Sequence, residues 1–198
     1  MQRIRLVLWA MVAAGLVAAG ALTVAAIKQP EPAALVNAGP FGGEFQLVDH
    51  NGEPVTEAIL RGRPSALFFG FTHCPDVCPT TLFEMANWIE TLGDKVDDMG
   101  FVFVTVDPER DTPEIMRDYV GAFSERITGV TGEPEAVAEM VKKFHIYARK
   151  TPLEGGGYTM DHTATVFLLD AEGRLEGTIS MQETKETAVA KIERLVAQ

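Results

Sequence analysis

The sequence FTHCPDVCP, residues 71–79, joins an apolar run to an amphipathic segment and contains both cysteines of the 198-residue chain. The run that leads into it, SALFFGF, has the length and composition of a buried strand. After it, apolar side chains recur at helical spacing until the next glycine. Cys74 and Cys78 each precede a proline, which disfavours the α conformation, so we predict that the helix begins at Pro79. Both thiols then lie where a strand turns into a helix.

Strands and helices alternate through the rest of the chain. Further strands are predicted at 45–48, 54–55, 101–106, 163–169 and 175–180, and further helices at 112–123, 133–144 and 183–196. The alternation indicates an α/β fold, and the hairpin of the last two strands makes the sheet mixed. Residues 44–198 are enough for one hydrophobic core, so we predict a single domain there.

An uncharged apolar run of 22 residues, 6–27, precedes this domain. As a helix it has a length of roughly 30 Å, the thickness of a bilayer's hydrocarbon core. It is longer than the apolar region of a signal peptide and lacks a strong cleavage site, so we predict a membrane anchor over residues 1–27. A cleaved signal peptide is the alternative. Residues 28–43 contain several prolines and glycines, and we predict a linker there.

Charge indicates the location of the domain and the class of its partners. Arg3 and Arg5 precede the apolar run, which by the positive-inside rule keeps the N-terminus in the cytoplasm. We therefore expect a single-pass protein of a bacterial cytoplasmic membrane with its domain on the periplasmic side. From residue 28 onward the chain carries 15 basic and 28 acidic residues, a formal net charge of −13. This charge excludes nucleic acid as a partner and is typical of a soluble domain or of one that meets a basic partner.

The position of the two cysteines favours reactive chemistry. A thiol at a helix N-terminus faces unpaired N–H groups and the positive end of the helix dipole, which favours the thiolate. A thiolate is both a nucleophile and a soft metal ligand, so either redox exchange or soft-metal binding follows. The alternative is a structural disulfide, but the loop closed between Cys74 and Cys78 is short and gains little from loop entropy.

A histidine is the natural third ligand, and the chain has four. His162 follows a glycine-rich loop, residues 153–161, and precedes a buried strand. Loops at one edge of an α/β sheet converge, so His162 is expected to face the cysteine loop. His50 in a hairpin turn is expected to lie at the surface, and His145 after an amphipathic helix is expected to be a packed or C-terminal helix residue. His73 adjoins Cys74, but neighbouring side chains leave the backbone in different directions.

Two thiolates and an imidazole suit Cu(I) in a three-coordinate site, and suit Cu(II) with one further ligand. Structural zinc usually takes four ligands and has no evident fourth one here, so zinc ranks second. Met160 offers a thioether, but packing in the loop is the favoured explanation for it. Asp161 is expected either to orient the ring of His162 or to be a solvated carboxylate.

Three motifs together resemble the Sco/SenC family of copper-binding, thioredoxin-fold assembly factors for cytochrome c oxidase. They are FTHCPDVCPTTL (71–82), VDPERDTPE (106–114) and DHTATVFLLDAEG (161–173), and the resemblance extends over roughly residues 40–197. It implies a thioredoxin-like fold in which Cys74, Cys78 and His162 bind one copper ion, Cu(I) or Cu(II). It also implies that the two cysteines cycle between dithiol and disulfide. Asp107 belongs to the second motif, but its spacing does not decide its role, and shaping the loop beside the site is one possibility.

The resemblance implies a metallochaperone rather than an enzyme. Its partner would be the binuclear copper centre of oxidase subunit II, to which it delivers copper or whose cysteines it reduces. A periplasmic copper donor or thiol reductant would be a further partner. The alternative is a thiol–disulfide oxidoreductase that acts on a partner's copper-ligand cysteines without delivering copper.

Two features of the sequence bear on the rival redox enzymes. Thioredoxin-type exchange enzymes usually space their cysteines C-x-x-C, whereas three residues separate Cys74 from Cys78. Such enzymes also carry a proline in the loop before the late strand, where this chain has Asp161-His162. A peroxidase of peroxiredoxin type requires Thr or Ser three residues before its reactive cysteine, and Phe71 and Pro75 stand at those places.

Overall fold

The computed structural model describes Trp9 and residues 40–198. The predicted membrane anchor, apart from Trp9, and most of the predicted linker lie outside the described residues. Among the residues that are described, no helix is both long and apolar enough to cross a membrane. The boundaries of the anchor, the linker and the domain therefore stay predictions.

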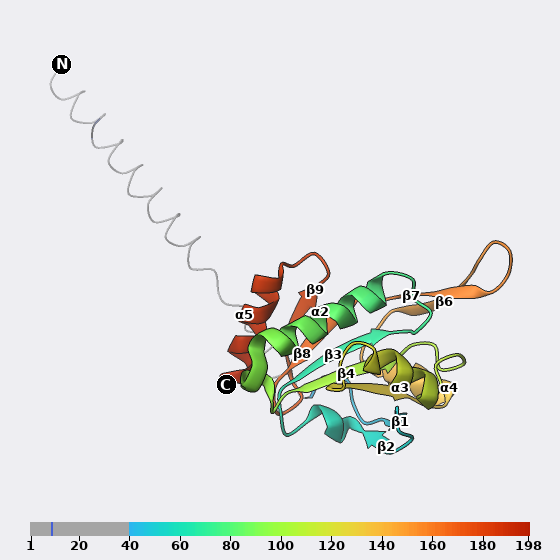
Figure 1. The fold of residues 1–198 in the computed structure, drawn as a ribbon, viewed down its shortest axis with the longest axis horizontal. Helices are drawn as coiled ribbons and strands as arrows, with labels where there is room; N and C mark the ends of the chain where they lie inside the picture. The colour runs from blue at the N-terminus through green and yellow to red at the C-terminus, as the bar shows by residue number, and fades with distance from the viewer. Residues whose placement is uncertain (1–8, 10–39) are drawn as a thin grey trace. The chain divides into compact units, whose positions relative to one another are not determined.

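The domain is built on a mixed sheet of seven strands in the order β2-β1-β5-β4-β3-β8-β9 (Figure 1). The strands are β1 (Gln46–Asp49), β2 (Pro54–Thr56), β3 (Ser65–Gly70), β4 (Gly100–Thr105), β5 (Ile127–Thr131), β8 (Thr165–Leu169) and β9 (Leu175–Ser180). The central strands β3, β4 and β5 are parallel, while β1, β8 and β9 run antiparallel to their neighbours. Every residue of β3 and β4 is buried, as expected of strands covered on both faces. The predicted α/β fold with a mixed sheet is confirmed.

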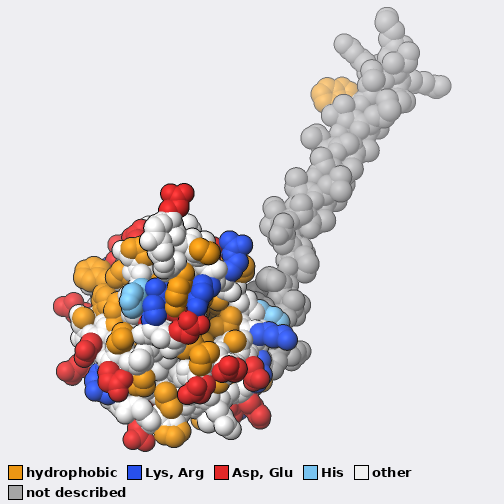
Figure 2. All heavy atoms as spheres, turned by 90° about the vertical axis from the view of Figure 1, so that its right-hand side faces the viewer, with side chains coloured by type: hydrophobic (Ala, Val, Ile, Leu, Met, Phe, Trp, Pro, Cys, Tyr) orange, Lys and Arg blue, Asp and Glu red, His pale blue; other side chains and the backbone are white. Residues whose placement is uncertain are grey.

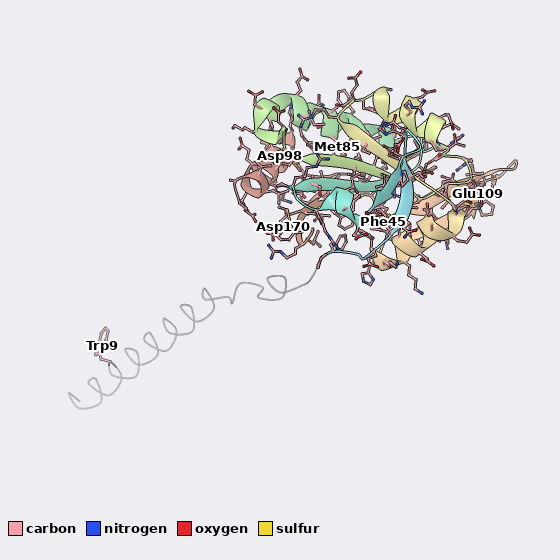
Figure 3. All side chains as sticks on the ribbon, turned by 90° about the horizontal axis from the view of Figure 1, so that it is seen from below. Trp9, Phe45, Met85, Asp98, Glu109 and Asp170 are labelled. Atoms are coloured by element: carbon pink, nitrogen blue, oxygen red, sulfur yellow. The ribbon has the colours of Figure 1, made fainter. Side chains whose placement is uncertain are left out.

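Helices cover both faces of the sheet: α2 (Val77–Leu92), α3 (Pro113–Gly121) and α5 (Lys185–Val196) on one face, α4 (Pro134–Lys143) on the other. On the first face, the ring of Phe103 in β4 lies 5.8 Å from that of Tyr119 in α3. On the second, Phe69 of β3 packs 5.7 Å from Phe144, which directly follows α4. Figure 3 shows the sheet between α2 and α3 on one side and α4 on the other. Two short 3-10 helices, η1 (Glu57–Leu60) and η2 (Gly93–Val96), complete the layers.

Threonine caps explain two of the three predicted helix starts after residue 100, and Pro134 at the first helical position marks the third. Thr112 caps α3 by accepting a hydrogen bond from the backbone N–H of Ile115, and Pro113 takes the first helical position. Thr184 caps α5 in the same way, with the N–H of Thr187 as donor. The three later helices are thus confirmed to within a few residues.

Two features were predicted wrongly or missed. Residues 153–161 are not one glycine-rich loop, because β6 (Ala148–Pro152) and β7 (Tyr158–His162) pair as a separate two-stranded hairpin. Strand β6 is polar, and in β7 only Tyr158 and Met160 alternate with polar residues, which is too short a pattern to mark a strand. Strand β5 was missed because it is short and contains Gly129, whose missing side chain leaves room for Met116 of α3.

Candidate metal centre

The two cysteine thiols lie together at the N-terminus of α2. Cys74 belongs to the loop after β3 and is half-buried, whereas Cys78 is completely buried. The backbone N–H of Cys78 donates to Sγ of Cys74 over 3.3 Å, and both thiols are free. The predicted helix start at Pro79 was wrong, since α2 begins at Val77. Proline is tolerated in this first turn because its missing N–H has no partner within the helix.

His162 ends strand β7 and brings an imidazole to the thiols. Its Nε2 lies 3.4 Å from Sγ of Cys78. Its Nδ1 lies 3.0 Å from the carbonyl oxygen of Thr163, which only accepts, so a proton on Nδ1 would donate there and leave the lone pair of Nε2 for a metal ion. The ring packs edge-on against Phe71, with centroids 5.7 Å apart. The ligand atoms of Cys74, Cys78 and His162 all lie within 4.8 Å of one another, close enough to hold one metal ion.

The two sulfurs share one proton unequally. The hydrogen bond from the Cys78 thiol, followed by hydrogen bonds from His162 and from the backbone of Asp76 and Cys78, lowers the pKa of Cys74 to about 3. The same hydrogen bond and burial raise the pKa of Cys78. At neutral pH the half-buried sulfur is therefore a thiolate and the buried one holds the proton, which a metal ion would displace.

Gly70, the last residue of β3, forms the floor beneath Cys78. A Cβ atom at this position would lie 2.8 Å from Sγ of Cys78 and 2.7 Å from the ring of Phe103. Because real Cβ atoms do not approach so closely, a glycine is required if the thiol is to keep its place. Sequence reasoning did not single out this glycine, which stands only four residues before Cys74.

A buried carboxylate in the loop after β4 holds the cysteine loop. Oδ2 of Asp111 accepts from the backbone N–H of Thr72 (3.0 Å) and from the hydroxyl of Thr105 (2.6 Å), and Oδ1 accepts from the hydroxyl of Thr72 (2.6 Å). Burial raises the pKa of Asp111. Thr72 lies two residues before Cys74, so Asp111 fixes the chain that carries the first thiol. The motif at 106–114 was the signal for this residue, but its partner is 39 residues away in the sequence.

Asp107 also stays outside the group of three ligands. Its buried carboxylate accepts from the hydroxyl of Tyr158 (2.8 Å) and from Nε of Arg110. It therefore joins the loop after β4 to the hairpin that carries His162.

The other three histidines of the described chain lie outside the group of Cys74, Cys78 and His162. Nδ1 of His50 accepts from the backbone N–H of Gly129 over 2.9 Å and so ties the first hairpin to β5. His145 is exposed just after α4, with a φ of 55°. His73 is half-exposed and its Nδ1 lies 3.1 Å from the hydroxyl of Thr72.

Two neighbours of His162 resolve the alternatives left open above. The carboxylate of Asp161 accepts from Thr151 (2.8 Å) and Arg149 (3.2 Å). Adjacent strand residues point to opposite faces, so Asp161 does not orient the imidazole, and the carbonyl of Thr163 does. Met160 packs against the hydrophobic core, which is the packing role that the sequence favoured for it.

Comparison with known proteins gives consistent matches. The family model described as SCO1/SenC matches residues 33–197. The SCO2-like protein RP587 of Rickettsia prowazekii is 40% identical over 136 residues, which are 68% of this chain and 66% of that protein. The chain spans about half to two thirds of the length of such curated relatives.

Two solved structures share the fold. ScoI of Bradyrhizobium japonicum with copper bound is 43% identical, with a TM-score of 0.73 over 78% of this chain and 99% of that one. Yeast Sco1 with copper bound is 34% identical, with a TM-score of 0.73 over 80% of this chain and 90% of that one. These likenesses confirm the thioredoxin-like fold that the sequence resemblance implied.

Proposed function

Because this chain belongs to the SCO1/SenC family, we propose that it binds one copper ion through Cys74, Cys78 and His162 and carries it to a partner protein. The observation that carries the proposal is the convergence of two sulfurs and one imidazole nitrogen within 4.8 Å. Two relatives of similar fold have been solved with copper bound. The copper is cargo, held by residues that also have to release it.

The kind of donor favours copper over zinc. Thiolate sulfur is soft and suits Cu(I), and an imidazole extends the set to Cu(II) when a further ligand from solvent or a partner joins. A structural zinc site takes four ligands. The group of ligating side chains in the described residues has three members, as a three-coordinate Cu(I) site requires.

The redox state of the cysteines controls whether copper is bound. Copper needs both sulfurs as thiolates, so loading releases the proton that Cys78 holds in the free protein. A disulfide between Cys74 and Cys78 would remove both sulfur ligands. Copper is therefore carried by the dithiol form only.

The family resemblance supports a specific recipient and location. We place the domain on the periplasmic side of a bacterial cytoplasmic membrane, held by an anchor at residues 6–27, with residues 28–43 as a linker. The recipient would be the binuclear copper centre of cytochrome c oxidase subunit II, which faces the same compartment. A periplasmic copper donor or thiol reductant would keep the site loaded and reduced.

The unequal thiols favour a second candidate function, reduction of the recipient's cysteines. The Cys74 thiolate would attack a disulfide of the partner, forming a mixed disulfide and releasing one partner thiolate. Cys78, after losing its proton, would attack the Cys74 sulfur, closing an intramolecular disulfide and releasing the second partner thiolate. Two electrons pass to the partner, and no copper is needed. The half-buried thiolate of Cys74 and the buried thiol of Cys78 suit these roles.

Copper retention separates the two functions. The full chain, purified in detergent, reduced and kept free of oxygen, is loaded with Cu(I) or Cu(II), desalted and analysed for metal, with His162→Ala alongside. The proposal expects one copper per chain and a thiolate-to-Cu(II) absorption band that His162→Ala alters. If no copper is retained while the cysteines exchange readily with a disulfide substrate, the reductase function replaces metal delivery.

A further inference from the structure

The hairpin that carries His162 is not part of the main sheet. Strands β6 and β7 pair only with each other, and Figure 1 shows the hairpin projecting at one end of the domain. Figure 2 views that end, where Lys and Arg side chains lie next to hydrophobic ones and acidic side chains lie mostly further out. Since no strand of the main sheet pairs with this hairpin, contacts beyond its base help to set the position of His162 relative to the thiols.

Those contacts converge on one short loop. In the described part of the chain, apart from the contacts of His162, every hydrogen bond and ion pair from the hairpin to the rest of the domain ends on residues 107–110. The Lys150–Glu109 ion pair, at 2.7 Å, is exposed at both ends and therefore weak. The other contacts all involve Tyr158.

Tyr158 is held from several directions. Its hydroxyl donates to the buried carboxylate of Asp107 over 2.8 Å, and its backbone carbonyl accepts from Arg110 over 3.2 Å. The guanidinium carbon of Arg110 lies 3.9 Å from the centre of the Tyr158 ring, and Nζ of Lys150 lies 4.1 Å from it. Cation–π contacts of this kind add to the hydrogen bonds, so Tyr158 is the main attachment of the hairpin.

The attachment lies on the same face of β7 as the metal ligand. Side chains alternate along a strand, so Tyr158, Met160 and His162 point to one face, toward the domain. Met160 packs against the core between them. The loop that receives Tyr158 also contains Asp111, which holds the chain before Cys74. The loop after β4 therefore holds both the chain before Cys74 and the hairpin that carries His162.

We infer that Tyr158 is a positioning residue for copper binding: it fixes β7 on the loop after β4 and thereby sets the distance between Nε2 of His162 and the two sulfurs. The inference rests on the proposed copper site. It predicts that Tyr158 matters for the form of copper that needs the imidazole, Cu(II), and little for Cu(I), which the two thiolates alone hold.

The test compares Tyr158→Leu and Tyr158→Phe in the full chain, in detergent and reduced, with Tyr147→Leu as a matched control. Tyr147 is exposed and directly precedes the same hairpin. Tyr158→Leu is expected to weaken Cu(II) binding about 10–100-fold, the usual effect of losing support around a metal ligand, and to change the nitrogen hyperfine splitting in the Cu(II) electron paramagnetic resonance spectrum. Tyr158→Phe keeps the ring and loses the hydroxyl, so its Cu(II) affinity should lie between those of Tyr158→Leu and wild type.

A double variant separates positioning from a general structural role. If Tyr158 acts through His162, Tyr158→Leu combined with His162→Ala binds Cu(II) no worse than His162→Ala alone. The inference would be overturned if the losses of Cu(II) affinity in the two single variants added up in the double variant. It would also be overturned if Tyr158→Leu lost Cu(I) and Cu(II) affinity equally, or left the Cu(II) spectrum unchanged.

A readout without metal keeps this inference separate from the proposed function. In the copper-free chain, the ring nitrogen chemical shifts of His162 are expected to change in Tyr158→Leu and to stay unchanged in Tyr147→Leu. If wild type binds no copper, the proposed function fails, and this comparison still decides whether Tyr158 positions the imidazole: unchanged shifts in both variants would contradict it.

Discussion

Sγ of Cys78 occupies the space that a side chain on Gly70 would need, since a Cβ atom there would lie 2.8 Å from the sulfur. The buried thiol is thus accommodated by the end of strand β3 and not only by its own helix. The cysteine motif and the strand before it therefore form one unit, in which the absence of a side chain at residue 70 is as necessary as the presence of a thiol at residue 78.

Gly70→Ala tests this relationship. The added methyl group should displace Cys78 and Phe103, lower the free energy of unfolding by about 1–3 kcal/mol and shift the thiolate-to-Cu(II) band. Gly177→Ala is the matched control, because a Cβ atom on Gly177 meets nothing within 4 Å. Denaturant unfolding and absorption spectra of both variants provide the measurement. If Gly70→Ala has the same free energy of unfolding and the same absorption spectrum as Gly177→Ala, the proposed crowding of Cys78 is wrong.

The reactivity of Cys74 should depend little on pH. Its pKa is lowered to about 3, so the thiolate fraction is already complete at pH 5 and does not rise toward pH 8. An ordinary thiol, with a pKa of about 8.5, gains close to tenfold in rate per pH unit over this range. Alkylation by iodoacetamide, mapped by mass spectrometry, measures the rate at each pH.

The variant Cys78→Ala supplies the control for this profile. It removes the thiol whose hydrogen bond is the largest cause of the lowered pKa, so the rate of Cys74 should regain a clear rise with pH. A steep profile in the wild-type chain would show that Cys74 is an ordinary thiol.

Asp111→Ala should destabilise the domain and loosen the cysteine loop. The substitution leaves the backbone N–H of Thr72 and two hydroxyl groups without their acceptor, at a cost of about 1–3 kcal/mol in the free energy of unfolding. Asp161→Asn, a change at a partly exposed carboxylate, should stay within about 0.5 kcal/mol of wild type and leave the copper spectrum unaltered. Urea unfolding curves test the stability, and a spectrum changed by Asp161→Asn would restore the orienting role that the structure assigns to Thr163.

The parts of this fold that could be predicted are those with a local signal. The apolar runs at 65–71 and 101–106 correspond to β3 and β4, and Thr112-Pro113 marks the start of α3. The hairpin β6–β7 could not be predicted, because β6 is polar and the apolar alternation of β7 is limited to Tyr158 and Met160. Its role depends on Tyr158, whose carboxylate partner is 51 residues away.

The candidate site divides in the same way. The residues that would touch the metal have chemistry visible in the sequence, because the chain has only two thiols and four imidazoles. The residues that hold them in place, such as Asp111 and Gly70, have ordinary chemistry and act through packing or long-range hydrogen bonds. Only the three-dimensional arrangement reveals them.

X-ray absorption spectroscopy at the copper edge of the full chain loaded with Cu(I) tests the central claim most directly. If Cys74, Cys78 and His162 hold the ion, the spectrum of wild type shows two sulfur neighbours and one nitrogen neighbour, and His162→Ala loses the nitrogen while keeping both sulfurs. A wild-type spectrum with fewer than two sulfurs, or one whose nitrogen remains in His162→Ala, would contradict the account.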